Sequence, residues 1–361
     1  MNLIRSGFLY VLSTSLLFLC CDFVITNYVI DVSQNKEKDY RVRHQYFDHS
    51  LKRNFTGSGV WGSESYPICT DSHGFKSSCS KALSERKKFD IAFIGDSFTE
   101  AIGLPYEKSF VGLFAQQNPD LEVANLGVAS YSPSVYLKKV EWLLNEGVRF
   151  DHLVVFVDIS DIQDEAVYYR EWDDGSLLPN SNSRGTLYIK QFITSNFSLL
   201  TTGYLQLSGF FGQKDLKKST DVFTLNRSSW TYDPSAEGYG TMGVHGGIEK
   251  ALSYMARLDS LLVANDIKLS VGVYPWPAQL KELSKSSESN KQSQIWADFC
   301  VGKCERFIDV FPRFSDLVRN GSVESVYAKY YLQGDIHFND LGNSEVFLEI
   351  LESMKVLNEP E

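Results

Sequence analysis

The sequence has little of several features that would assign a function at once. It contains only six histidines, no run of clustered Lys or Arg, and a formal net charge of −10. Because phosphate binding needs clustered positive charge, this balance argues against nucleic acid as a partner. The chain also lacks internal repeats and a phosphate-binding glycine-rich loop. Its 361 residues, 43% apolar and 22% charged, have the composition of a globular protein.

Alanine is absent before Ala82, so the N-terminal segment has no Ala-x-Ala site for signal peptidase. Residues 7–21 carry no charge, and apolar character resumes after Asp22 as far as Ile30. Such a stretch is long enough to cross a bilayer with Asp22 away from the midplane. We therefore expect residues 1–30 to be an uncleaved anchor in the inner membrane, with a cleaved signal peptide as the alternative. The rest of the chain would then lie in the periplasm or another extracytoplasmic space.

Two of the six cysteines lie in the apolar segment and four follow it. Proximity pairs Cys69 with Cys79 and Cys300 with Cys304, and such disulfides persist only in an oxidising compartment. The alternative is four free thiols in a cytosolic protein. A zinc site is disfavoured because no histidine lies near Cys300 or Cys304.

The pattern along the chain changes at residue 89. Residues 31–88 are polar and mixed, and we expect a linker followed by an irregular lead-in. From residue 89 to 361, β-rich runs alternate with helical patterns, which predicts right-handed crossovers and a parallel sheet covered on both faces. The β-rich runs are 89–94, 121–125, 151–157, 267–273 and 306–310, and the clearest helical patterns are 133–146, 247–264 and 341–356.

Residues 166–246 interrupt this alternation with a long stretch that contains no clean βα unit. A segment of this length in a compact domain is usually an inserted subdomain or lid. Its aromatic side chains either stack on sugar rings or, as we expect for most of them, form the core of the insertion. They include Tyr168, Tyr169, Trp172, Trp230, Tyr232 and Tyr239.

The apolar run in "FDIAFIGDSFTEAIGL", residues 89–104, stops abruptly at Gly95. A strand that ends there places Ser97 in the first turn after the sheet edge. A serine in that position is either a helix cap or a nucleophile. As a nucleophile it needs a base to remove its proton and a carboxylate to orient that base.

One histidine, His337, has the surroundings of such a base. It lies in "GDIHFNDLGN", where Asp335 precedes it by two residues. In an extended segment residues i and i+2 project to the same side, so Asp335 can reach Nδ1 of His337 while Nε2 faces outward. The alternative is a solvated loop histidine beside a helix-capping aspartate. The other five histidines have no nearby motif.

Three segments resemble the conserved blocks I, II and V of the SGNH/GDSL hydrolase superfamily: "IGDSFTE", "NLGVASYS" and "GDIHFNDLGN", in the family's order. The resemblance covers residues 89 to 356. It implies a flavodoxin-like three-layer α/β/α sandwich around a five-stranded parallel sheet, here with an inserted subdomain. It also implies that Ser97 is the nucleophile, His337 the base and Asp335 its orienting acid. The amides of Ser97 and Gly127 would form part of the oxyanion hole, where close backbone approach favours glycine.

Two features depart from the family pattern. The third block usually supplies an Asn to the oxyanion, but the chain has Asp158-Ile159-Ser160-Asp161 there. Ser160 could donate a hydrogen bond instead. The motif of Asp335 and His337 is Asp-x-His where Asp-x-x-His is commonest. A similar Asp-x-His occurs in alginate O-acetyltransferases, although there it precedes the serine.

Four acids follow the third β-rich run: Asp158, Asp161, Asp164 and Glu165. Paired carboxylates can cleave glycosides, and clusters of oxygen ligands can hold Ca²⁺ or Mg²⁺. More often, acids at the start of a helix complement its dipole, and we expect that role here. No metal or cofactor is predicted.

Together these features predict a membrane-anchored serine esterase or O-acyltransferase. Its substrate would be an acyl ester, chiefly an acetyl ester, of a cell-envelope glycan. Two alternatives remain open. One is a lipid esterase or lipase, and the other is a non-catalytic glycan-binding module with a degenerate site, suggested by the missing block III Asn.

Overall fold

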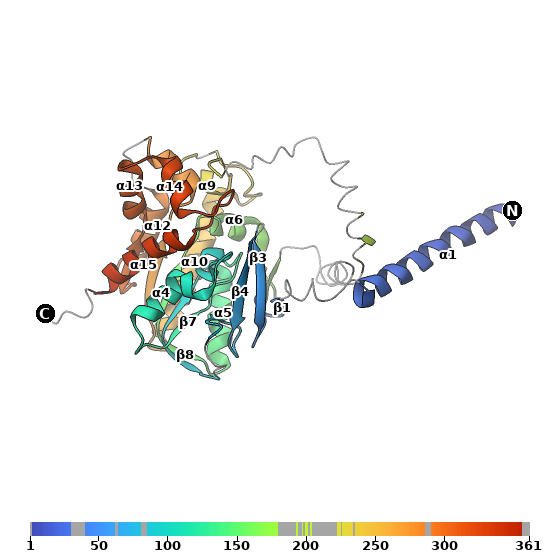
Figure 1. Cartoon of the computed structure of the whole chain (residues 1–361), viewed down its shortest axis with the longest axis horizontal. Coiled ribbons are helices and arrows are strands. Elements are labelled where there is room, and N and C mark those ends of the chain that lie inside the picture. The colour runs from blue at the N-terminus through green and yellow to red at the C-terminus, as the bar shows by residue number, and fades with distance from the viewer. Residues whose placement is uncertain are drawn as a thin grey trace. The chain divides into compact units, whose positions relative to one another are not determined.

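The computed structural model of the chain is shown in Figure 1. It describes residues 2–29, 40–61, 64–80, 85–179, 193, 197, 199–200, 203, 222–224, 226–233, 235–285 and 290–355. The chain divides into two compact units. The smaller comprises residues 1–38 and 181–218, and the larger comprises residues 39–180 and 219–361.

The smaller unit contains helix α1 (Asn2–Val24), which continues into a π-helical turn at Ile25–Val29. Asp22 is buried within this unit, where its two carboxylate oxygens accept hydrogen bonds from the backbone amides of Leu199 and Leu200. The membrane anchor expected over residues 1–30 coincides with α1. Across the described ranges, however, no helix is long and apolar enough to cross a membrane.

The larger unit is built on one eight-stranded sheet with the order β12-β11-β8-β6-β7-β5-β4-β3. Five neighbouring strands of this sheet are parallel, and they are the five β-rich runs predicted from the sequence. Ile91 to Ile94 are all buried, as expected for a strand covered on both faces. The five are β6 (Lys88–Ile94), β7 (Val123–Asn125), β8 (Arg149–Phe156), β11 (Lys268–Val273) and β12 (Arg306–Asp309).

Residues 31–88 differ from the expected linker and irregular lead-in, because most of the described part is β-structure. A separate hairpin joins β1 (Arg41–His44) to β2 (Asp48–Leu51). Beyond it, antiparallel strands β3 (Thr56–Trp61), β4 (Glu64–Thr70) and β5 (Lys76–Ser77) extend the main sheet past β7.

The glycines that suggested a linker in this region make room for aromatic rings. A Cβ on Gly59 would lie 2.6 Å from the ring of Tyr66, and one on Gly57 would lie 2.7 Å from the ring of Phe55. Glycine within a strand often marks such a close approach. The sequence pattern was therefore misleading here, since the glycines pack against side chains instead of providing flexibility.

The helices fall into two packed groups around this sheet. Helix α5 (Pro133–Asn145) packs against α10 (Gly243–Val263), while α15 (Asp340–Lys355) packs against α4 (Phe110–Gln117) and β12. The mixed α/β fold predicted by the alternating pattern is confirmed, and the three predicted helices correspond to α5, α10 and α15. The other helices of eight or more residues in the described part of this unit are α12 (Lys291–Cys300), α13 (Phe311–Arg319) and α14 (Val323–Tyr330).

Much of the expected insertion at 166–246 lies outside the described residues. Its described parts include strands β9 (Tyr169–Glu171) and β10 (Leu177–Pro179), which form a hairpin, and the short helix α9 (Asn226–Ser229). Trp230 is buried, and its indole N–H donates to the carbonyl of Ile159 at 3.0 Å. Tyr239 is buried as well. These two rings are core residues and cannot stack on a sugar.

The predicted disulfides are present. Cys69 is bonded to Cys79 across β4 and β5, and Cys300 is bonded to Cys304 at the end of α12. Cys20 and Cys21 are unpaired and exposed. The compartment in which the bonds form stays a prediction.

Candidate active site

Ser97 occupies the first position of a one-turn helix, α3 (Ser97–Glu100), directly after the carboxyl end of β6. The cap of this helix is Asp96, whose Oδ1 accepts a hydrogen bond from the amide of Phe98 at 2.9 Å. A Cβ on Gly95 would lie 2.2 Å from Thr99 Oγ1, so the turn from strand to helix requires glycine there. Asp96, not Ser97, therefore caps this helix, and the Ser97 hydroxyl can make other contacts.

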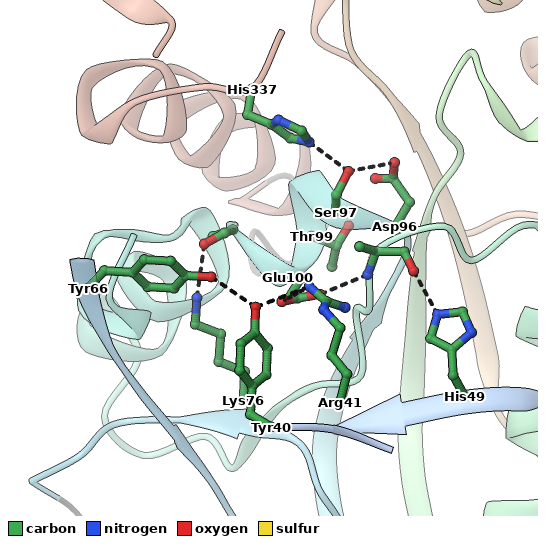
Figure 2. Close-up of polar contacts among 12 residues, drawn as sticks. Tyr40, Arg41, His49, Tyr66, Lys76, Asp96, Ser97, Thr99, Glu100 and His337 are labelled. Atoms are coloured by element: carbon green, nitrogen blue, oxygen red, sulfur yellow. Dashed lines mark hydrogen bonds and ion pairs between the residues drawn. The ribbon is translucent and has the colours of Figure 1, made fainter. Parts of the chain in front are cut away.

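The structure brings Ser97, His337 and Asp335 together from opposite ends of the chain. Ser97 Oγ lies 2.7 Å from Nε2 of His337, as Figure 2 shows. The other ring nitrogen, Nδ1, lies 2.5 Å from Oδ1 of Asp335. The same carboxylate oxygen accepts the backbone N–H of His337 at 3.0 Å, so the i, i+2 spacing orients the ring as the sequence suggested. This is the geometry of a Ser-His-Asp triad.

The environment of Asp335 keeps it ionised. Its Oδ2 accepts a hydrogen bond of 2.7 Å from the indole N–H of Trp61, on β3. Burial raises the pKa of Asp335, but the hydrogen bonds and charge of His337, together with Trp61, outweigh it and lower the pKa to about 2. An ionised Asp335 holds a proton on Nδ1 of His337. Nε2 is then an acceptor for the proton of Ser97.

Aromatic rings fix the position of the imidazole. The ring of Phe98, the residue after the nucleophile, lies 4.7 Å from that of His337, and the ring of Trp61 meets it edge-on at 5.4 Å. His337 itself is buried. Packing on two sides restricts rotation of the imidazole, which keeps Nε2 directed at Ser97.

Gly127 does not present a free amide to an oxyanion. Its N–H donates to the side-chain oxygen of Asn125 at 2.9 Å. A Cβ on Gly127 would lie 2.6 Å from the backbone nitrogen of Glu100 and 2.7 Å from the carbonyl carbon of Thr99. Glycine is needed at position 127 because this loop contacts α3. The sequence had instead suggested the oxyanion hole as the reason for this glycine.

Ser160 is buried at the start of α6 (Asp161–Gln163). Its amide donates to Oδ1 of Asp158 at 2.8 Å, and Oδ2 of Asp158 accepts the indole N–H of Trp276 at 2.7 Å. No hydrogen bond within the described residues joins Ser160 to the triad. The backbone of Ser160 is thus held in an internal turn, and donation from its side chain in place of the block III Asn stays a prediction.

The remaining acids of this region have protein partners, although Oδ1 of Asp161 is buried without a hydrogen bond from the described residues. Asp161 accepts the hydroxyl of Tyr136 at 2.8 Å, and burial, with Asp158 and Asp96 nearby, raises its pKa well above the ordinary value. Asp164 pairs with Arg227 at 2.6 Å. In the part of the chain that the structure describes, no three His, Cys, Asp or Glu side chains are grouped so as to hold a metal ion. The cation site considered for these acids therefore has no support.

Sequence reasoning missed the polar cluster behind α3, shown in Figure 2. Glu100 is fully buried; its Oε1 lies 2.6 Å from Arg41, and its Oε2 accepts the amide of Ala129 at 2.7 Å. Lys76 is also buried, and its ammonium donates to the carbonyls of Ala101 and Leu104. Burial lowers the pKa of Lys76 to about 8. The N-terminal strands thus hold both the end of α3 and the neighbouring loop.

Comparisons with known proteins find only distant similarities to this chain. No protein-family model and no curated protein matches it. A member of the lipolytic G-D-S-L family from Veillonella parvula is 11% identical, with a TM-score of 0.40, and the match covers 74% of this chain and 98% of that one. An acetylxylan esterase from Geobacillus stearothermophilus is 10% identical, with a TM-score of 0.41 and coverage of 73% and 93%.

Similarities this distant transfer neither a residue's role nor a substrate, so the site is judged on the contacts of this chain alone. A lipolytic G-D-S-L protein from Desulfitobacterium hafniense, 11% identical with a TM-score of 0.39, is matched over 74% of this chain and all of that one. In its motifs and in their order, the chain resembles the SGNH/GDSL hydrolase superfamily.

Proposed function

We propose that the protein is a serine esterase or O-acyltransferase that works through an acyl-enzyme on Ser97. The observation that carries this proposal is the 2.7 Å contact between Ser97 Oγ and His337 Nε2, with the ionised Asp335 behind the ring. As Oγ attacks the acyl carbonyl carbon, its proton passes to Nε2. The imidazolium that forms is stabilised by Asp335 and then gives the proton to the leaving oxygen.

In the second half of the reaction a water molecule or a sugar hydroxyl attacks the acyl-enzyme. His337 takes the proton of that hydroxyl and returns one to Ser97 Oγ as the ester bond breaks. Of the two amides expected to donate to the oxyanion, that of Gly127 is bonded to Asn125. The amide of Ser97 is therefore the donor in this proposal. A complete triad supports catalysis over the alternative of a degenerate binding module.

For the substrate we propose an acyl ester, chiefly an acetyl ester, of a cell-envelope glycan. Two disulfides in the larger unit support an oxidising, extracytoplasmic location. Transfer requires a site that holds an acceptor hydroxyl and limits water. Of the rings first considered for sugar stacking, Tyr168 and Tyr232 remain exposed.

The test is turnover of a small aryl acetate by the wild-type chain, with free acetate and acetylated sugar measured separately, with and without an oligosaccharide acceptor. Ser97→Ala should abolish both products while the melting temperature changes little, and His337→Ala, which also removes a buried ring, should abolish them in a chain that remains folded. Activity retained in Ser97→Ala would overturn the proposal. Acetylated sugar identifies a transferase, and its absence with every acceptor identifies an esterase.

A further inference from the structure

Ser97 Oγ has two hydrogen-bond partners but only one proton to give. Besides His337 Nε2 at 2.7 Å, it lies 3.0 Å from Oδ2 of Asp96 (Figure 2). His337 Nε2 is an acceptor, because Asp335 holds the ring proton on Nδ1. If Asp96 were ionised, its Oδ2 would be a second acceptor, and the two would compete for the Ser97 proton.

The two oxygens of Asp96 are placed differently. Oδ1 accepts two hydrogen bonds, from the amide of Phe98 at 2.9 Å and from the hydroxyl of Tyr274 at 2.8 Å. Oδ2 has Ser97 Oγ as its one hydrogen-bond partner among the described residues. An oxygen that already accepts two donors is satisfied as a carbonyl, so a proton on the carboxyl group belongs on Oδ2.

The surroundings of Asp96 favour its neutral form. The side chain is buried, and burial together with the negative charge of Asp158 raises its pKa to about 7. Arg227, a cation facing this group of acids, pairs with Asp164 instead. The titratable groups that face Asp96 from the neighbouring elements are His337, Asp158, Asp161, Tyr274 and Tyr136.

We propose that Asp96 is a second acid of the catalytic site, protonated on Oδ2 in the active enzyme and donating its hydrogen bond to Ser97 Oγ. The inference rests on the proposed function. With this arrangement the hydroxyl of Ser97 points at His337 and at no other acceptor. One lone pair of Oγ accepts from Asp96, and the other remains to attack the acyl carbonyl.

The proton balance of the reaction does not change. Ser97 still gives its proton to His337 as the C–O bond forms, and it recovers a proton from the imidazolium as the acyl-enzyme breaks down; Asp96 keeps its own proton throughout. A neutral Asp96 also removes a negative charge 3.0 Å from Ser97 Oγ, on which negative charge develops as the acyl-enzyme breaks down. Like charges at that distance would oppose this step.

The inference predicts a loss of activity on the alkaline side of the pH profile. Activity falls as Asp96 ionises and takes the hydrogen bond of Ser97 for itself. Past that ionisation, kcat/KM should fall about tenfold per pH unit. The turning point should lie near neutral pH. Burial brings the pKa of Lys76 to about 8 and that of Lys139 to about 7, so the Asp96→Asn variant is needed to assign the fall to Asp96.

The test is Asp96→Asn in the full chain. The amide nitrogen of Asn copies the protonated Oδ2 as a donor, and its oxygen still accepts from Phe98 and Tyr274. The variant should lose the fall at high pH, so that its activity at alkaline pH, relative to its own maximum, exceeds that of wild type. Asp158→Asn should move the fall to lower pH, because it removes the negative neighbour that raises the pKa of Asp96.

Three results would overturn the inference: a folded Asp96→Asn that is inactive at every pH, an unchanged alkaline fall in that variant, or an unchanged fall in Asp158→Asn. The infrared band of a protonated carboxyl group gives a readout that needs no turnover. At slightly acid pH the band should be stronger in wild type than in Asp96→Asn, and its absence from the difference spectrum would also overturn the inference. A wild type without turnover in which that band is present would contradict the proposed function alone.

Discussion

Trp61 lies 274 residues before Asp335 in the chain, yet its indole N–H holds the outer oxygen of that acid at 2.7 Å. Trp61→Phe keeps an aromatic ring beside His337 but removes the indole donor and part of the ring volume. A hydrogen bond to a charged group contributes about 1.5–3 kcal/mol. The Asp335 side chain is 25% exposed, so water can replace the lost donor in part and the lower end applies. We therefore expect kcat to fall roughly tenfold with KM nearly unchanged, since the loss affects the imidazolium formed in the transition state.

The pH profile separates this effect from a loss of packing. The pKa of Asp335 lies below its ordinary value in the folded enzyme, so its contribution is complete above the unfolded value and is lost as pH falls through about 2. Without the indole donor that pKa rises, and acid inactivation should begin at higher pH. The matched control is Trp142→Phe, at a half-buried tryptophan on α5 whose ring meets that of Phe47 edge-on. If both variants lose activity equally, or if Trp61→Phe keeps full kcat, Trp61 does not orient the triad.

Three further predictions concern the supports of the site and its redox state. Glu100→Gln leaves the Arg41 charge without its buried partner and should lower the free energy of unfolding by about 3 kcal/mol, measured by urea titration. The exposed control Glu249→Gln should change this free energy little. Equal stabilities of Glu100→Gln and wild type would show that the pair contributes nothing. Gly127→Ala places a methyl group against the backbone of Thr99 and Glu100 and should cost about 1–3 kcal/mol, seen as a lower melting temperature, so an unchanged melt would contradict the packing described. Non-reduced peptide mapping of exported protein should recover Cys69–Cys79 and Cys300–Cys304, while four alkylated thiols would contradict the extracytoplasmic location.

The parallel strands could be predicted because short β-rich runs alternate with helical patterns, and the central strands β6 and β8 are largely apolar and buried on both faces. The antiparallel edge could not be predicted in the same way. Gly57 and Gly59 resemble linker residues until the rings of Phe55 and Tyr66 are seen to lie across them. Composition alone does not distinguish a flexible glycine from one that makes room for an aromatic ring.

The contacts of the candidate site were also predictable only in part. Asp335 and His337 are two residues apart, so local geometry was enough to pair them, and the motif around Ser97 supplied the third member. The contacts of Trp61 with Asp335 and of Arg41 with Glu100 join residues far apart in the sequence, and a single sequence contains no signal for such pairs.

The role expected for Gly127 was a different kind of error. The residue does need to be glycine, but the structure gives a packing reason for it, and its amide is bonded to Asn125. The side-chain oxygen of Asn125 lies two residues before that amide, so the bond is a local turn. A required glycine identifies a close approach without telling which neighbour approaches.

The central claim is that Ser97 is a nucleophile activated by His337. Labelling of the intact chain with a fluorophosphonate, followed by peptide mass mapping, tests it most directly. The account predicts one adduct per chain, located on Ser97, absent in Ser97→Ala and formed far more slowly in His337→Ala although both variants remain folded. An adduct on another serine, or equal labelling rates in wild type and His337→Ala, would contradict it.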